Sequence, residues 1–419
     1  MTMRLTEAEK DARPLIALQQ VCIPHYRRHL YETLGADPRF RFQVLADPSV
    51  DVPFLPLAEA PSRCEFKAAA QYLISLPHGL SLSWQPIALT TMLRERPDVV
   101  VAQGSPYDLT AWMLTIAGRV IGLPVLLWTH GLQGEESGLK WMVRALLYKL
   151  SRGLLLYGEH AKHLLMAKGV AADRLHVIYN SLDDRAQATV FQRIAPEDCE
   201  GFRRVLGIDP GERLICFTGR LQPVKRLPWF LQALNLVVKQ GRSVHLVLVG
   251  EGSERPVLES LARELGLTKL VHFLGASFDE SHLGLVLAAS DLAVVPSGAG
   301  LSVMHALAYG TPVLLHDKIE EHFPEWEAVT EGETGWFYRH DDLSDCADKI
   351  IDALFPSPKK PAMTAACRAV IADRYNTASH ARLFIDAIAK HCSLDSSLGT
   401  DQTRSDVALS SGSLEHSAR

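Results

Sequence analysis

The sequence predicts an α/β protein made of two doubly wound halves, each built on its own parallel sheet. Three observations predict this fold class: the chain is 419 residues long, short apolar runs alternate with longer helical patterns, and the alternation occurs twice. A chain of this length exceeds one ordinary domain, and apolar runs without strict alternation suit strands buried on both faces. The predicted strands are Leu15–Leu18, Phe42–Leu45, Val99–Ala102, Val125–Thr129, Gly153–Tyr157, Leu175–Ile178, Leu214–Thr218, Val244–Val249, Val271–Leu274, Leu292–Val295 and Val313–Leu315.

Helical patterns between these strands complete the repeated βα order of a doubly wound fold. The clearest are Pro228–Lys239, Glu254–Leu265 and Ser302–Tyr309. The break between the halves falls near residue 190, because Asp183–Gly201 is charged and shows neither strand nor helix periodicity, which indicates a linker. The expected division is an N-terminal Rossmann-like domain over residues 1–190, a C-terminal one over 191–375 and a disordered, polar tail over 393–419.

Composition narrows the possible functions. The net charge is −5 and the pI is near 6.4, so the chain has no global basic field and we expect no nucleic-acid partner. Hydrophobic residues make up 47% and charged residues 22%, the balance of a globular protein with a large core. The 7 cysteines include no Cys-x-x-Cys pair, which argues against a zinc site or a disulfide framework and suits a reducing cytoplasm.

No segment of the sequence is expected to cross a membrane. The most apolar stretch, Trp112–Trp128, is interrupted by Arg119 and broken at Gly122–Pro124, whereas a spanning helix needs roughly 20 apolar residues in a row. Met1–Arg13 is polar and charged, unlike a signal peptide. We expect a cytoplasmic protein, and contact with the inner face of the membrane stays open.

A first motif follows the strand that opens the C-terminal half. Gly219 allows a sharp turn there, and Arg220 and Lys225 place two cations at the carboxyl end of the strand, before a helix. A diphosphate requires such a site, in which a guanidinium fork, an ammonium and backbone donors near a helix N-terminus come together. Taken alone, the two residues would sooner be interpreted as solvated surface cations.

A second strand ends in a glycine-bearing turn with Glu251 and Gly252. This signal is weak, because tight βα turns commonly use glycine. The sequence contains neither a P-loop pattern nor a complete Gly-x-Gly-x-x-Gly fingerprint. Phosphate transfer from ATP and nicotinamide chemistry are therefore not favoured.

A third strand leads into a loop with Gly298 and Gly300, and a helix begins there with Leu301 and Ser302. Small residues let a ligand approach the backbone, and the free amides of the first helical turn point towards it. His305 lies one turn into the same helix, near the same ligand. Without the surrounding motif, His305 would be interpreted as a packed or solvated helix residue.

These three elements, in this order and spacing, resemble family 4 of the GT-B glycosyltransferases. The resemblance covers Leu214–Arg339, including the later segment Pro324–Gly335. It implies that Arg220 and Lys225 hold the diphosphate of a nucleoside diphosphate sugar. It also implies that the loop Gly298–Ser302 contacts the donor sugar and phosphates.

The resemblance also implies a fold and a mechanism. The fold is GT-B, in which two Rossmann-like domains face each other across a cleft and the last helix, about residues 376–392, packs back on the N-terminal domain. The mechanism is a retaining sugar transfer that uses no cofactor and no metal ion, and the sequence has no Asp-x-Asp cluster of the kind metal-dependent sugar transferases use. The leaving diphosphate would be stabilised by cations and helix-end amides.

The chain departs from the family at two positions. The family commonly has one glutamate before the glycine loop and another eight positions later, where this chain has Ser297 and His305. The first glutamate usually contacts the donor sugar and the second usually grips the ribose, which a neutral histidine could also do through a ring nitrogen. Either recognition of the donor is altered or activity is lost, and the intact Arg220 and Lys225 favour altered recognition.

The N-terminal half is expected to bind the acceptor. His130 ends a buried strand and matches a family histidine that lines the cleft, where it could hydrogen-bond sugar hydroxyls or assist proton movement. His25, Tyr26 and Arg27 follow the first strand and could meet an anionic acceptor such as a lipid-linked diphosphate. The alternatives are a satisfied strand-end histidine and a solvated first helical turn.

The segment Leu139–Lys149 predicts a cationic amphipathic helix. Such a helix could lie on an anionic membrane surface, and packing on the core with a solvated basic face explains the pattern equally well. Peripheral membrane contact is therefore one of two interpretations.

The expected function is transfer of a sugar from a nucleoside diphosphate donor to a glycan, lipid-linked or small-molecule acceptor, in polysaccharide or glycoconjugate biosynthesis. Two alternatives remain: a sugar-nucleotide epimerase or hydrolase on the same fold, and a non-catalytic protein that binds sugar nucleotides. The sequence predicts neither the sugar, the base, the acceptor nor the oligomeric state.

Overall fold

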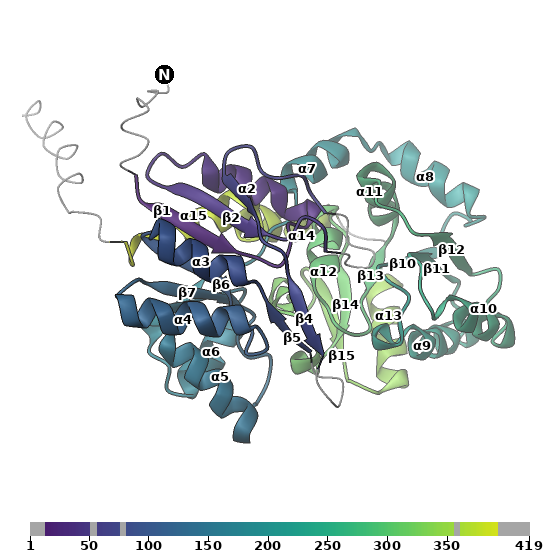
Figure 1. Cartoon of the computed structure of the whole chain (residues 1–419). Helices are drawn as coiled ribbons and strands as arrows, with labels where there is room; N and C mark the ends of the chain where they lie inside the picture. Colours follow the sequence, from purple (N-terminus) through teal and green to yellow (C-terminus); the bar gives the residue numbers. More distant parts are fainter. Residues whose placement is uncertain (1–12, 51–56, 76–80, 356–360, 393–419) are drawn as a thin grey trace, which may run out of the picture.

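Two parallel sheets form the frame of the chain, as the predicted fold class requires. The structure is a computed structural model that describes residues 13–50, 57–75, 81–355 and 361–392. Figure 1 shows the two sheets side by side, the first in purple and blue and the second in green. The tail predicted to be disordered, residues 393–419, lies outside the described residues.

The first sheet has the strand order β3-β2-β1-β6-β7-β8-β9, and every pairing in it is parallel. Its strands are β1 (Leu15–Gln19), β2 (Arg41–Ala46), β3 (Glu65–Ala68), β6 (Val99–Gln103), β7 (Val125–Thr129), β8 (Gly153–Leu156) and β9 (Leu175–Val177). A separate antiparallel hairpin comprises β4 (Tyr72–Ser75) and β5 (Ser81–Trp84).

Helices cover both faces of the first sheet because its strands bury side chains in both directions. Ile16 and Leu18 of β1 share a core with the first and last helices, whereas Ala17 shares a core with four others. The first core includes α2 (Arg28–Gly35) and α15 (Thr377–Ala389). The second includes α3 (Pro86–Glu95), α4 (Leu109–Ile121), α5 (Gly138–Leu150) and α6 (Glu159–Ala167).

The second sheet has the order β12-β11-β10-β13-β14-β15, again with parallel pairings throughout. Its strands are β10 (Arg213–Thr218), β11 (Val244–Val249), β12 (Val271–Gly275), β13 (Leu292–Val294), β14 (Val313–His316) and β15 (Gly335–Tyr338). One face packs on α11 (Glu280–Ala289), α12 (Leu301–Ala308) and α14 (Pro361–Asp373). The other face packs on α9 (Leu227–Lys239), α10 (Arg255–Glu264) and α13 (Leu343–Leu354).

The prediction of an irregular linker over Asp183–Gly201 is wrong. These residues form α7 (Asp184–Arg193) and most of α8 (Pro196–Val205), and both helices pack against α11. The Asp183 side chain caps α7. The sequence did not predict these helices because they are polar overall: α7 buries only Gln187, and α8 buries no residue completely.

The chain passes between the two sheets twice, and the two passages touch each other. After α14 it returns to the first sheet, where α15 packs against α2. Thr377, which begins α15, donates from its backbone N and its Oγ1 to Asp184 Oδ1 at 2.8 and 2.6 Å. Asp184 begins α7, just after the first passage. The contact between Asp184 and Thr377 therefore joins the two passages.

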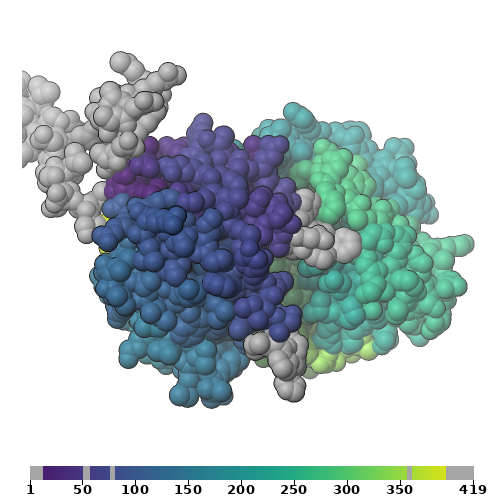
Figure 2. All heavy atoms as spheres, viewed as in Figure 1, coloured from purple at the N-terminus to yellow at the C-terminus, as the bar shows by residue number. Residues whose placement is uncertain are grey.

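A carboxylate from the second half holds the N-terminus of a helix in the first. Glu327 lies in the short helix η6 (Pro324–Ala328) and accepts hydrogen bonds from the backbone N–H groups of Glu159 and His160 at 2.9 and 2.8 Å. These two amides open α6, where a helix favours negative charge. A Cβ on Gly158, the position before them, would lie 2.3 Å from Glu327 Oε1, so a larger residue there would push the carboxylate away from these amides. Figure 2 shows the two halves in contact.

No helix within the described part of the chain has both the length and the apolar character that crossing a bilayer requires.

The last helix carries a buried histidine whose protonation should control stability in acid. His380 of α15 is completely buried, and its Nδ1 lies 3.0 Å from Ser181 Oγ. Burial, followed by repulsion from Arg27, lowers its pKa to about 3. The unfolded chain binds the proton from about pH 6.5 downwards and the folded chain does not, so this histidine removes stability as the pH falls.

When the pH falls from 7 to 5, the free energy of unfolding of the parent should decrease because of His380. We predict that the decrease is about 2 kcal/mol smaller in the His380→Gln variant. Urea unfolding at both pH values measures the difference. The exposed His163→Gln variant serves as the control and should follow the parent. An equal loss in parent and His380→Gln would show that His380 is not kept neutral in the folded chain.

Candidate functional site

A cleft with a volume of about 1640 Å³ lies between the two halves and is lined by residues of both. It opens at the carboxyl ends of strands from each sheet, where doubly wound folds bind ligands. Pockets for a single small ligand measure roughly 300–1,000 Å³. The cleft therefore has room for two substrates at once.

Two glycine turns meet at the edge of the second sheet. A Cβ on Gly250, after β11, would lie 1.9 Å from the carbonyl oxygen of Gly219, after β10. The backbones of the two turns therefore touch, and no larger residue fits between them. This contact places Arg220 and Glu251, the next residue of each turn, beside each other on the cleft wall.

Lys225 is anchored to the glycine loop across the cleft edge. Its Nζ donates to the carbonyl oxygens of Gly298 and Ser297 at 3.0 and 3.4 Å. Burial, followed by repulsion from Arg220, lowers its pKa. Arg220 itself is exposed to the cleft. Two cations thus lie close together: Lys225 is half-buried and fixed, whereas Arg220 is exposed and can reach a ligand.

The glycine loop presents the start of α12 to the same place. Gly298 has a left-handed φ of 62°, and a Cβ there would approach Lys225 Nζ to 3.2 Å. Gly300 precedes the first residue of α12, so the unpaired amides of its first turn face the cleft. Ser297, in contrast, is buried and does not line the cleft.

The Nε2 nitrogen of His305 is engaged by a neighbouring carboxylate. Its Nε2 lies 2.9 Å from Glu280 Oε1, and the Tyr309 hydroxyl donates to the same oxygen at 2.7 Å. Burial alone would raise the pKa of Glu280, but the hydrogen bonds from His305, Tyr309 and Gln187 outweigh it and lower the pKa. Glu280 lines the cleft, so at this point the site presents a carboxylate held by a histidine.

The opposite wall is built around Arg27 of η1 (His25–Arg27). Its guanidinium lies 4.3 Å from the centre of the Trp128 ring and donates to the Tyr157 hydroxyl. His130 stacks on Tyr157 with ring centres 4.7 Å apart. Burial, then repulsion from Arg27, lowers the pKa of His130 to about 4, although part of the ring is open to the cleft. The imidazole is therefore neutral at pH 7.

A buried carboxyl group lies between the two walls. Glu325 is 3% exposed, and its Oε1 accepts from Asn180 Nδ2 at 2.7 Å. Its Oε2 is buried without a hydrogen-bond partner among the described residues. Burial raises the pKa of this group, so it holds a proton more readily than an ordinary glutamate.

Most of the predicted site residues meet in this cleft, and two do not. Those that line it are His25, Tyr26, Arg27, His130, Arg220, Lys225, Glu251, Gly298, Gly300, Leu301, Ser302 and His305. Ser297 and Gly252 are absent from its lining. Sequence analysis missed Glu280 and gave Glu325 no role. The position of Glu280 in the cleft follows only from the packing of α11 against the rest of the fold. Glu325, in contrast, lies in the segment Pro324–Gly335, which already resembled the family.

Two family models match the chain. The one described as "Glycosyl transferases group 1" matches residues 212–355. The one described as "Glycosyltransferase Family 4" matches residues 29–185. Together the matches span more than half of the chain, one in each half.

Individual proteins with known names are similar to parts of this chain. The D-inositol 3-phosphate glycosyltransferase of Nocardia farcinica is 34% identical over 202 residues, which are 46% of this chain and 42% of that protein. The 2-deoxystreptamine glucosyltransferase of Streptomyces kanamyceticus is 27% identical over 257 residues, 56% of this chain and 64% of that protein. The chain thus spans less than two thirds of either relative.

One solved structure, Anabaena Alr3699/HepE in complex with UDP, superimposes with a TM-score of 0.66 at 18% identity, over 90% of this chain and 100% of that one. At this identity the likeness concerns the fold alone.

We predict that inorganic pyrophosphate binds where Lys225 and Arg220 meet the start of α12. Lys225→Gln should weaken the binding at least roughly tenfold, because a hydrogen bond to a charged group contributes about 1.5–3 kcal/mol. Lys239→Gln, at the exposed far end of α9, makes the same charge change and should leave the affinity unchanged. Isothermal titration calorimetry at constant ionic strength measures all three proteins. Equal losses in both variants would indicate only a general charge effect.

Proposed function

We propose that this chain, which belongs to the group 1 glycosyltransferases of family 4, transfers a sugar from a nucleoside diphosphate to a hydroxyl group of an acceptor. The observation that carries the proposal is the meeting of Arg220, Lys225 and the amides of α12 at one edge of a two-walled cleft. These groups supply the cations and donors that a diphosphate requires. The relatives are named glycosyltransferases, and HepE was solved with UDP, which supports this donor class.

The proposed chemistry is a retaining displacement in which no side chain acts as nucleophile. The acceptor oxygen forms a bond to the anomeric carbon on the face from which the diphosphate leaves. The acceptor proton passes to the departing phosphate oxygen. Arg220, Lys225 and the α12 amides stabilise the charge that develops on this diphosphate, and this is where most of the rate acceleration would arise.

His130 would position the transferred sugar. A ring with a pKa of about 4 is a weak base at neutral pH, so hydrogen bonding to a sugar hydroxyl suits it better than proton removal. Its stacking on Tyr157 and its contact with Phe323, whose ring centre is 5.6 Å away, fix the orientation of the imidazole.

Glu280 would bind the ribose of the donor in place of the glutamate that the family commonly has at position 305. A carboxylate can accept hydrogen bonds from both hydroxyls of a vicinal diol. His305, which holds Glu280, lies four residues after the start of α12, a rise of about 6 Å along the helix. A nucleotide whose diphosphate sits at the helix start therefore brings its ribose close to Glu280.

The acceptor would bind along the first sheet, next to Arg27. An anionic acceptor suits the guanidinium, and a lipid-linked one suits α5. Four apolar side chains of α5, at positions i, i+3, i+4 and i+7, are exposed to solvent rather than packed on the core: Leu139, Met142, Val143 and Leu146. With the exposed Lys149 beside them, they form a surface that fits an anionic membrane.

The direct test is turnover. Purified protein incubated with UDP-, GDP- and ADP-sugars should release nucleoside diphosphate from one donor class, faster when lipid extract supplies acceptors. Arg220→Ala and Lys225→Ala should each reduce turnover by at least about tenfold. NMR of the product gives the anomeric configuration, and inversion would overturn the retaining mechanism. Donor binding without turnover over a broad acceptor panel would instead favour a non-catalytic binding protein.

A second test separates the ribose site from the phosphate site. Glu280→Gln should weaken nucleoside diphosphate binding by roughly tenfold or more while leaving pyrophosphate affinity unchanged. The exposed Glu333→Gln variant makes the same change elsewhere in the second half and should bind both ligands like the parent. If Glu280→Gln weakened both ligands equally, Glu280 would be supporting the fold and not the ribose.

A further inference from the structure

Among the described residues, a histidine at the end of β14 forms no hydrogen bond through either ring nitrogen. His316 is 0% exposed, and within the described ranges neither Nδ1 nor Nε2 forms a hydrogen bond. Leaving a buried polar group unpaired costs about 1–3 kcal/mol. The ring is held nonetheless, because His322 stacks on it with ring centres 4.0 Å apart and lies 2.9 Å from its carbonyl oxygen through Nε2. A rigid, unpaired imidazole is well suited to bind a ligand.

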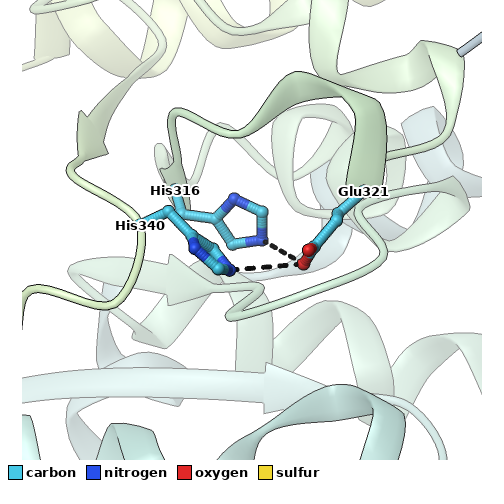
Figure 3. A group of neighbouring side chains, drawn as sticks. All are labelled: His316, Glu321 and His340. Atoms are coloured by element: carbon cyan, nitrogen blue, oxygen red, sulfur yellow. Dashed lines mark ion pairs between the residues drawn. The ribbon is translucent and has the colours of Figure 1, made fainter. Parts of the chain in front are cut away.

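Two further side chains converge on this imidazole. Glu321 ends the short helix η5 (Ile319–Glu321), and His340 follows β15. Glu321 Oε2 lies 3.8 Å from His316 Nε2 and 3.4 Å from His340 Nε2. Figure 3 shows both nitrogens directed at the same carboxylate oxygen.

The three ligand atoms lie slightly farther apart than the ligands of a tetrahedral metal ion. The three ligand atoms all lie within 4.8 Å of one another. Metal–nitrogen and metal–oxygen bonds of about 2.0–2.2 Å place the ligand atoms of a tetrahedral zinc ion roughly 3.3–3.6 Å apart. Small side-chain adjustments therefore bring all three atoms to bonding distance.

Neighbouring carboxylates and ammonium groups orient the ligand atoms. Asp341 Oδ2 lies 3.0 Å from His340 Nδ1, which directs the lone pair of the opposite nitrogen, Nε2, into the cluster. Such carboxylate–histidine pairs are typical outer partners of metal ligands. Lys318 binds the other oxygen of Glu321, Oε1, at 2.7 Å, so Oε2 remains directed at the histidines.

A cation already lies beside the cluster. A terminal nitrogen of Arg226, NH1, is 2.6 Å from His340 Nε2, and the other terminal nitrogen pairs with Asp341. A metal ion at Nε2 would displace NH1, and Arg226 would keep its ion pair with Asp341. The positive charge of Arg226 thus competes with the ion. Substituting Arg226 by a neutral residue should therefore strengthen metal binding.

We propose that His316, Glu321 and His340 bind one divalent transition-metal ion, zinc by the match of two imidazoles and a carboxylate, with a fourth position for water. The absence of cysteine pairs argues only against a thiolate site. His316 precedes the segment 317–323 and Glu321 lies within it; Ile319, Glu320 and Phe323 of this segment line the cleft, whereas the three ligands do not. The ion would fix this part of the cleft wall and take no part in neutralising the diphosphate.

The test is zinc binding to metal-stripped, tag-free full-length protein, measured by calorimetry and by competition with a chelating dye. One ion should bind and raise the thermal midpoint, and cobalt in its place should give the visible spectrum of a tetrahedral site. Glu321→Gln and His340→Ala should each weaken binding at least about tenfold, the smallest loss expected even for an outer partner. The exposed His163→Ala variant should bind like the parent.

Arg226→Gln should bind zinc more tightly than the parent because the competing cation is gone. Unfolding curves of the metal-free variants identify any that fail to fold, and the comparison uses only the folded ones. Absence of binding to the parent, equal binding by all ligand variants, or unchanged affinity in Arg226→Gln would each overturn the proposed site. None of these measurements depends on sugar transfer, so the metal site and the proposed activity stand or fall separately.

Discussion

The contact between Glu327 and the N-terminus of α6 is the interaction on which the cleft depends. It joins residues that are 168 and 167 positions apart in sequence and belong to different sheets. It helps to fix the separation between the walls that carry Arg27 and Lys225. The neighbouring pair Asn180–Glu325 lies on the same seam. Ring contacts between His130 and Phe323 and between His160 and Trp326 also join the two halves.

The second half divides its charges between fixed and mobile groups. Lys225 is tied to the glycine loop, whereas Arg220 is exposed and can adjust to a ligand. Under the proposed function, Glu280 of the preceding helix, α11, takes the place of the carboxylate that the family commonly has on α12, and His305 holds it. The substitution of the family's glutamate by His305 would then move a charge between neighbouring helices.

The sequence predicted the parts of the fold that depend on local apolar patterns. All eleven predicted strands lie within or overlap strands of the two sheets, because strands buried on both faces give unbroken apolar runs. It failed for α7 and α8, whose faces are mostly solvated. Glu280 and the group of His316, Glu321 and His340 were out of reach for another reason: their members come from separate elements, and only packing brings them together. The meeting of Lys225 with the glycine loop was predictable because each belongs to a short motif that directly follows a parallel strand, and parallel strands end at the same edge of a sheet.

The bond between Thr377 and Asp184 gives the molecule one hinge in place of two. If the chain passed between the two halves at two distant points, the halves could rotate only about the line through those points. Here the two passages lie side by side, so they restrict rotation of the halves little more than a single connection would. Opening the cleft then requires the loss of the seam contacts, which include the hydrogen bonds of Glu327 and the ring contacts His130–Phe323 and His160–Trp326.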